Sequence, residues 1–283
     1  MAESSSVTLL AKGRFYGSIL KTAHVADAQL SLVRHEHARS VPAHEHECAY
    51  FCLLIAGRYV ECYGEDTMEY HPMTMAFHPP RYRHTDEIGQ EGSVFFMIEL
   101  ADAWISRLAD VLDLHTVKVE LRGNDLVWIA MSVFREFQDL NDGSELQIES
   151  LLYELAAGAA RLPTIGAVDD SWVGTAVNFL ERHVTEPLTV KQIATESGVH
   201  PVTLARGFRI RYQQTVNEFI SRLRVRLACE RFLNDGGATL AAVSAECGFV
   251  DQSYFTKVFK SITGTTPAAF REMVRASMPT ERA

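Results

Sequence analysis

The sequence of 283 residues lacks several features that would assign it to a compartment or a protein class. No window reaches the roughly 18 consecutive apolar residues of a membrane span. The opening stretch MAESSSVTLLAKGRF has neither a basic leader nor a long apolar run. The five cysteines form no paired CxxC framework, and their odd number argues against disulfides. We therefore expect a cytoplasmic protein with reduced thiols and no membrane partner.

An overall excess of positive charge, which would suit a nucleic-acid-binding protein, is also missing, because the formal net charge is −9 at pH 7. The charge is unevenly distributed. Residues 1–170 carry 13 basic and 26 acidic side chains, whereas residues 171–275 carry 13 basic and 9 acidic ones. A mildly basic half beside an acidic half indicates two domains with separate partners. A solvated acidic surface is the simpler explanation of the N-terminal excess.

The spacing of apolar residues changes along the chain. Over residues 1–100, short apolar runs such as ECAYFCLLI and SVFFMIEL are separated by turn residues, which predicts an antiparallel barrel or sandwich. Over residues 101–161 the spacing becomes helical, and these apolar helices favour a homodimer. Pro163 and Gly166 mark a linker at 162–171. The expected fold class is therefore α+β multidomain, with a β-barrel and helical hairpin followed by an all-α domain.

An internal repeat lies in that all-α domain. TVKQIATESGV at 189–199 matches TLAAVSAECGF at 239–249 position by position. Each copy predicts a short helix, a turn at a glycine in the left-handed conformation, and a second helix. We expect two helix-turn-helix units, over about 189–211 and 239–262, joined by a helix of roughly 18 residues. Such a helix is about 27 Å long, close to the 34 Å of one DNA turn, so both units could contact one face of a duplex. A plain helical bundle is the alternative.

The same region resembles a known family. The stretch GFVDQSYFTKVFKSITGTTPAAFR, with its ordered Gly-Phe, Ser-Tyr-Phe, Gly-Thr-Thr-Pro and Phe-Arg elements, is similar to the DNA-binding domain of AraC/XylS-type transcription regulators. The resemblance covers residues 172–275. It implies binding to double-stranded promoter DNA, with RNA polymerase as a further partner. The sequence departs from the family at Tyr212-Gln213, where an aromatic-Gly pair is usual, so the docking of the first unit is less well defined.

Carried over by position, the resemblance assigns the DNA-contacting residues. The second unit's groove helix begins near Asp251 and presents Gln252, Ser253, Thr256, Lys257 and Lys260. The first unit's groove helix begins at Pro201 and presents Val202, Thr203, Ala205, Arg206 and Arg209. Gln252 can pair bidentately with adenine, Lys257 can reach guanine or phosphate, and Arg206 is the expected base reader of the first unit.

Two further sets of residues recur along these helices. Leu204, Phe208, Phe255 and Phe259 hold equivalent positions in the two units, and we expect them in the core. Arg222, Arg224, Arg226 and Arg231 lie on the connecting helix. They are either phosphate contacts or solvated helix charges.

The N-terminal half resembles a cupin-type barrel, as found in many such regulators. In HEHECAYFCLLIAG, the spacing from His44 and His46 to Gly57 matches the first cupin motif, and PPRYRH, ending at His84, resembles the second. Metal-binding cupins carry a glutamate four residues after the second histidine. Here Tyr50 occupies that position, which counts against cupin enzyme chemistry.

Strand alternation predicts a pocket around these histidines. If no bulge intervenes, His44, His46, Cys48, Tyr50 and Cys52 share one strand face. We expect an effector pocket lined by His44, His46, Tyr50 and His84, with His35 and His37 outside it. His44, His46 and His84, or two of them with the Cys48 thiolate, are suitable ligands for zinc or another divalent transition metal. The alternatives are an organic effector without metal, or histidines that are only hydrogen-bonded within the barrel.

The sequence thus predicts a transcription regulator that binds DNA through its C-terminal half and a small molecule or metal through its N-terminal half. No catalytic residue is assigned. One alternative is a metal-dependent cupin enzyme with a helical appendage. Another is a constitutive DNA-binding protein whose degenerate barrel serves oligomerisation.

Overall fold

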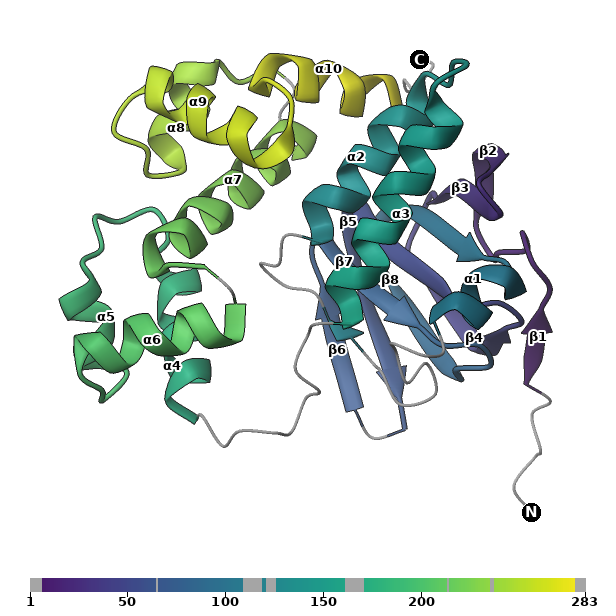
Figure 1. Cartoon of the computed structure of the whole chain (residues 1–283), viewed down its shortest axis with the longest axis horizontal. Helices are drawn as coiled ribbons and strands as arrows, with labels where there is room; N and C mark the ends of the chain where they lie inside the picture. Colours follow the sequence, from purple (N-terminus) through teal and green to yellow (C-terminus); the bar gives the residue numbers. More distant parts are fainter. Residues whose placement is uncertain are drawn as a thin grey trace. The chain divides into compact units, whose positions relative to one another are not determined.

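The computed structural model describes residues 7–64, 66–108, 119–120, 126–160, 171–212, 214–234 and 237–277. The chain forms two compact units, residues 1–161 and 162–283 (Figure 1). Of the predicted linker at 162–171, residues 162–170 lie outside the described residues. Helix α4 begins at Ser171. Within the described ranges, no helix is both long and apolar enough to cross a membrane.

The N-terminal unit is a strand-rich half-barrel. Its strands are β1 (Thr8–Leu10), β2 (Ser18–Val25), β3 (Ala28–His35), β4 (Arg39–His46), β5 (Tyr50–Tyr63), β6 (Asp66–Tyr70), β7 (Thr74–His78), β8 (His84–Leu100) and β9 (Val119–Glu120). The hydrogen-bonded order is β1-β4-β8-β5-β7-β9, with β3 pairing with β2 and β8, and β6 with β5. The prediction of a β-rich domain followed by a helical one is confirmed.

The long strands β5 and β8 bend where two glycines meet. One edge of β8 pairs with β5, while its other edge pairs with β4 near its start and with β3 near its end. The β5–β8 register shifts on both sides of Gly57. Gly57 has φ +85° and Gly92 has φ +73°, a left-handed region that glycine enters without steric cost. This bend allows β8 to change partner and curves the sheet around its inner face.

Strand β7 and long parts of β3, β5 and β8 are buried on both faces, which explains their continuous apolar runs. The inner-face cluster comprises Val33, Val41, Tyr50, Cys52, Leu54, Tyr59, Tyr70, Ala76, Ile88, Phe95 and Met97. On the other face Phe96 packs against helix α2 (Leu126–Gln138), with its ring 5.1 Å from Phe134 and 5.2 Å from Phe137. Helices α2 and α3 (Ser144–Ala160) lie together over the sheet in Figure 1.

The region 101–161 is not helical throughout, so the sequence-based expectation is corrected there. Besides α1 (Asp102–Leu108), α2 and α3, it contains the strand β9, in which Val119 lies opposite Phe77 of β7. A two-residue strand has no periodicity to detect, and a β-branched residue beside an unpaired strand edge pairs readily. Residues 109–118 and 121–125 of this region lie outside the described part of the chain.

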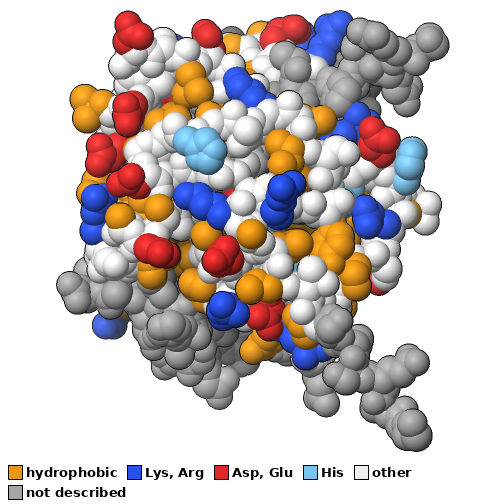
Figure 2. All heavy atoms as spheres, turned by 90° about the vertical axis from the view of Figure 1, so that its right-hand side faces the viewer, with side chains coloured by type: hydrophobic (Ala, Val, Ile, Leu, Met, Phe, Trp, Pro, Cys, Tyr) orange, Lys and Arg blue, Asp and Glu red, His pale blue; other side chains and the backbone are white. Residues whose placement is uncertain are grey.

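Acidic and basic side chains are interspersed on the side of the molecule that bears β1 to β4. Figure 2 views this side and shows charges of both signs mixed with hydrophobic side chains. Among the exposed apolar residues of β1 and β2 are Leu9, Ile19 and Leu20. The mixture on this side is consistent with a solvated surface as the origin of the N-terminal acidic excess.

The C-terminal unit consists of helices. They are α4 (Ser171–Arg182), α5 (Val190–Glu196), α6 (Pro201–Tyr212), α7 (Val216–Asn234), α8 (Leu240–Glu246), α9 (Gln252–Thr263) and α10 (Pro267–Ser277). Helices α5 and α6 form the first helix-turn-helix, α8 and α9 the second, and the 19-residue α7 joins them. Gln213, where the sequence departs from the family pattern, lies outside the described residues.

The two copies of the repeat use the same local devices. The Thr189 hydroxyl accepts a hydrogen bond from the Gln192 backbone, and the Thr239 hydroxyl accepts one from Ala242, so each threonine caps the first helix of its unit. Gly198 and Gly248 have φ +68° and +78° in the following turns. Equivalent aromatic and leucine side chains fill the two cores without exposure: Leu204, Phe208, Phe255 and Phe259.

Candidate functional site

The groove helices α6 and α9 present most of their predicted DNA-contacting residues to solvent. In the first unit Val202 is 68% exposed, and Thr203, Arg206 and Arg209 are also exposed. In the second unit the exposed residues are Gln252, Ser253, Lys257 and Lys260. Thr256 is half-buried, and its hydroxyl donates to the Gln252 carbonyl oxygen at 2.9 Å. The helices therefore offer mixed polar and basic faces.

Helix α9 begins and ends with defined caps. The Asp251 carboxylate accepts from the Tyr254 backbone N–H at 2.7 Å, and Gly264 adopts φ +73° at the C-terminus. These caps fix the position of Gln252, the first residue of the helix. Two exposed side chains beside Gln252 were missed by the sequence reasoning, namely Val250, 90% exposed, and Tyr254, 49% exposed.

Two arginines of α7 bind within their own domain. Arg224 donates to the carbonyl oxygens of Val184 and Glu186, both at 2.8 Å. Arg226 pairs with Glu181 at 3.4 Å. These bonds tie α7 to the end of α4 and to the segment that follows it. Arg224 and Arg226 therefore have a structural role in place of the two roles considered from sequence, phosphate contact and free solvation. For Arg222 and Arg231, phosphate contact stays a prediction.

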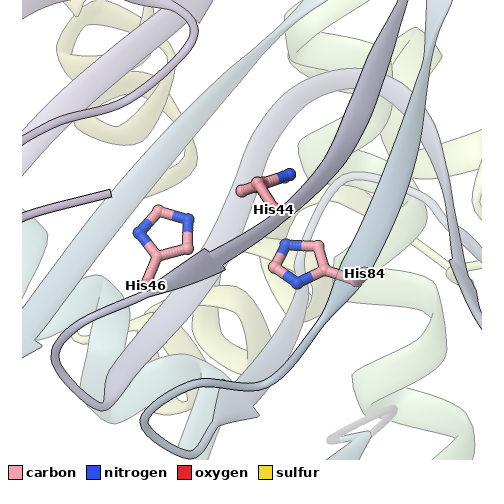
Figure 3. A group of neighbouring side chains, drawn as sticks. All are labelled: His44, His46 and His84. Carbon is pink, nitrogen blue, oxygen red and sulfur yellow. The ribbon is translucent and has the colours of Figure 1, made fainter. Parts of the chain in front are cut away.

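A second candidate site lies inside the half-barrel, where β4 and β8 bring three histidines together. His44 and His46 lie on β4, and His84 begins β8 directly opposite His44 (Figure 3). All three side chains are buried. One ring nitrogen from each lies within 4.8 Å of the others. Tyr50 faces the same pocket, with its hydroxyl 3.5 Å from His84 Nε2.

Two expectations about neighbouring residues are corrected. Cys48 lies in the turn between β4 and β5, outside the pocket lining, because the strand ends at His46 and a new one begins at Tyr50. His35 lines the pocket, although we expected it outside, because the end of β3 pairs with β8 and brings its ring 5.8 Å from that of Phe95. His37 is exposed, as expected.

Three ionisable residues of this site were missed. His78 at the end of β7 lies 2.9 Å from the Glu61 carboxylate of β5, and both are buried. The Asp86 carboxylate oxygen Oδ2 lies 3.9 Å from His44 Nε2 and 4.0 Å from His84 Nε2. Strand alternation from His84 to Asp86 was the available signal. Tyr50 replaces the expected acid, and Glu61 of β5 and Asp86 of β8 lie near the histidines instead.

The buried histidines are held in their neutral form. Burial, and then the neighbouring His44, His84 and His78, lower the pKa of His46 to about 2. Burial also lowers the pKa of His84 to about 3 and that of His35 to about 4. A neutral imidazole keeps one lone pair, which is the form that binds metal ions. Burial first, and then Glu61 and Glu87, raise the pKa of Asp86 well above its ordinary value.

The C-terminal unit matches known proteins in sequence. Residues 193–273 match a family described as a helix-turn-helix domain. The chain is 29% identical over 132 residues to a putative AraC-like transcription regulator of Streptomyces antibioticus, across 45% of this chain and 43% of that protein. It is 30% identical over 105 residues to the bifunctional transcriptional activator/DNA repair enzyme AdaA of Bacillus subtilis, across 37% of this chain and 49% of AdaA. It spans less than half the length of both relatives.

A shorter relative is covered almost completely. The regulatory protein SoxS of Salmonella typhimurium is 28% identical over 99 residues, across 35% of this chain and 92% of SoxS. Among solved structures, ToxT from Vibrio cholerae O395 is 15% identical with a TM-score of 0.38, across 88% of this chain and 98% of ToxT. The DNA-binding domain of AdpA in complex with a target DNA is 23% identical with a TM-score of 0.37, across 40% of this chain and 99% of that domain.

Proposed function

We propose that this chain, whose C-terminal unit is an AraC-type helix-turn-helix domain, is a sequence-specific transcription regulator controlled by an effector in its N-terminal half-barrel. The observation that carries the proposal is the pair of helix-turn-helix units on one continuous helix. Helix α7 has 19 residues and is therefore about 28 Å long. That length suits two groove helices entering successive major-groove segments of one duplex face.

In this proposal, some residues of the groove helices contact bases and others contact the DNA backbone. Gln252 and Arg206 read base edges, because an amide can pair bidentately with adenine and a guanidinium with guanine. Lys257, Lys260 and Arg209 supply positive charge near the backbone, with Thr203 and Ser253 as hydrogen-bonding neighbours. Val202 makes an apolar contact with the methyl group of thymine. The Arg224 and Arg226 bonds hold α7 in place between the units.

The sensor site in this proposal is the histidine pocket. Its neutral imidazoles suit a divalent transition metal such as zinc, and His46 Nδ1 is buried without a hydrogen-bond partner among the described residues. A bound ion would be held by His44, His46 and His84. Its positive charge would lie near the carboxyl groups of Asp86 and Glu61, whose neighbours are otherwise neutral imidazole rings. A small organic molecule contacting Tyr50 and the same histidines is the other effector class that this lining suits.

The remaining partners follow from the same role. We infer a homodimer, because Leu146 and Tyr153 on helix α3 are 75% and 46% exposed, and apolar side chains on one helix face favour burial against a second copy. Promoter DNA and RNA polymerase place the protein in the cytoplasm. We infer no enzymatic reaction, although the relative AdaA is named as a repair enzyme as well as an activator.

The full chain should enrich a defined sequence from a library of random DNA duplexes. Selection with and without added Zn²⁺, or with a metabolite extract, then tests control by the pocket. His84→Ala should change the response to the effector and leave the enriched sequence the same. Failure to enrich any sequence under all conditions would reject the regulator. Enrichment with no response to either addition would favour a constitutive DNA-binding protein.

A further inference from the structure

The carboxylate of Asp86 lies between the ring nitrogens of two histidines. Its Oδ2 atom is 3.9 Å from His44 Nε2 and 4.0 Å from His84 Nε2. In both rings the other nitrogen has a partner that fixes the tautomer. His44 Nδ1 is 3.0 Å from the Pro42 carbonyl oxygen, and His84 Nδ1 is 3.0 Å from the Tyr82 carbonyl oxygen. A carbonyl oxygen only accepts hydrogen bonds, so each Nδ1 carries the hydrogen and each Nε2 carries a lone pair.

Two lone pairs therefore face a carboxylate group in a buried pocket. Such an arrangement is repulsive unless the carboxyl group is protonated or a cation lies between the three atoms, and a metal ion satisfies both nitrogens and the oxygen at once. The second carboxylate oxygen, Asp86 Oδ1, is buried without a hydrogen-bond partner within the described residues. The Tyr50 hydroxyl lies 3.5 Å from His84 Nε2, at the limit of a hydrogen bond. Bonding of an Nδ1–H to a backbone carbonyl is also the usual way in which proteins orient a metal-binding histidine.

The distances from Asp86 to His44 and His84 agree with a shared metal ion. Two ligand atoms that each lie about 2.0 to 2.2 Å from one ion can be at most about 4.4 Å apart. Both distances from Asp86 Oδ2 fall within that limit. The three histidine nitrogens spread over 4.8 Å, so the most distant pair must approach by about half an ångström. Rotation of one imidazole ring about its side-chain bonds is sufficient for such a change.

The size of the pocket favours an ion over an organic molecule. The pocket encloses about 60 Å³. That volume holds a few water molecules, whereas sites for organic ligands measure roughly 300 to 1,000 Å³. The lining combines large apolar side chains such as Phe95 and Met97 with the histidines, Asp86 and tyrosine hydroxyls such as that of Tyr50.

We propose that Asp86 is the acidic ligand of a divalent transition-metal site formed with His44, His46 and His84. This carboxylate from β8 takes the place of the acid that is missing at Tyr50. The ligand set has three neutral nitrogens and one oxygen anion, so a divalent ion retains a single net positive charge. Such a set suits borderline ions such as Zn²⁺ or Co²⁺. The inference rests on the proposed sensor role of the pocket and names its ligand class.

The test uses the full chain, freed of metal by chelation and titrated with Co²⁺, whose visible absorption reports its ligands. The wild type should bind one Co²⁺ per chain. Asp86→Asn should weaken binding at least tenfold and change the spectrum, whereas Asp86→Glu, which keeps a carboxylate, should retain most of the affinity. Glu87→Gln is the matched control, because Glu87 is the adjacent, exposed residue of the same strand and its carboxylate bonds Ser40 instead.

X-ray absorption of the Zn²⁺-loaded wild type provides a readout that does not depend on the folding of any variant. It should show three imidazole ligands and one carboxylate oxygen. Equal Co²⁺ affinity and spectra for Asp86→Asn and the wild type would overturn the role of Asp86. A wild type that binds neither ion would overturn the metal site altogether. Neither result affects selection of a DNA sequence by the full chain, so a failed metal site is distinguishable from a failed regulator.

Discussion

Gly57 of β5 approaches Gly92 of β8 so closely that a Cβ built on Gly57 would lie 2.1 Å from the Gly92 carbonyl oxygen. A backbone atom cannot move aside as the end of a side chain can, and Gly57 also has φ +85°. Gly57→Ala should therefore destabilise the half-barrel by about 1 to 3 kcal/mol. Hydrogen exchange of β5 and β8 measures this as a lower free energy of local opening.

Gly64 is the control for this glycine substitution. It has φ +57° but no atom within 4 Å of an added Cβ, so Gly64→Ala carries the backbone strain without the clash. It should destabilise the unit less than Gly57→Ala does. Equal effects of the two substitutions would mean that the close approach of β5 and β8 contributes nothing beyond the dihedral angle.

Base preference should depend on one residue in each groove helix. Gln252→Ala and Arg206→Ala should each relax the preference at one position of the selected site, at a cost of about 1 to 3 kcal/mol for a bidentate contact. Binding to a panel of single-base variants of that site measures the change. Ser261→Ala, at an exposed position near the end of α9, is a suitable control. Preference and affinity that survive Gln252→Ala would show that α9 docks in a different register.

Lys260→Ala should weaken binding to all sequences alike. Lys260 is exposed in the last turn of α9, where its charge can reach a phosphate but its position is far from the helix start. Each lost phosphate contact reduces the slope of log affinity against log salt by about 0.9. Titrations at several salt concentrations should therefore give a smaller slope than the wild type. A loss of preference at one base, with an unchanged slope, would instead make Lys260 a base reader.

Glu99 should make the half-barrel less stable as pH rises. Burial raises the pKa of Glu99 to about 7, although the Gly13 N–H and Lys12 act in the opposite direction. In the unfolded chain this carboxyl ionises near pH 4.5, whereas in the folded protein it stays protonated up to about pH 7. The free energy of unfolding therefore falls between these two pH values. The stabilising contribution is complete below pH 4.5 and is lost as pH rises through 7.

Glu99→Gln removes this titration and keeps an oxygen that can accept from Gly13. The difference in unfolding free energy between this variant and the wild type should change across that pH range. Glu91→Gln, at an exposed position of the same strand, is the control for removing a carboxylate from β8. A constant difference for Glu99→Gln would mean that Glu99 ionises in the folded protein as it does in the unfolded chain.

The local signals of the C-terminal unit could be read from sequence. The repeated threonine and glycine positions specify helix starts and turns through interactions within a few residues, so the pattern alone predicts both units. Thr189 and Gly198 recur as Thr239 and Gly248 with the same caps and dihedral signs.

The surroundings of the histidine pocket depend on contacts that sequence spacing does not encode. His78, Glu61 and Asp86 come from three strands and meet because β5 pairs with both β7 and β8, while the pairing of β8 with β4 places them beside His44. The turn after His46 removes Cys48 from the face that strict alternation would give it. The short strand β9 and the position of His35 likewise follow from pairing between distant segments.

Hydroxyl-radical footprinting of the full chain on its selected duplex tests the central claim most directly, because it reports how many helix-turn-helix units contact DNA. Two protected segments, about one helical turn apart on one face of the duplex, are the predicted result for units joined by the rigid helix α7. Protection of a single short segment, or of none, would contradict recognition by both units.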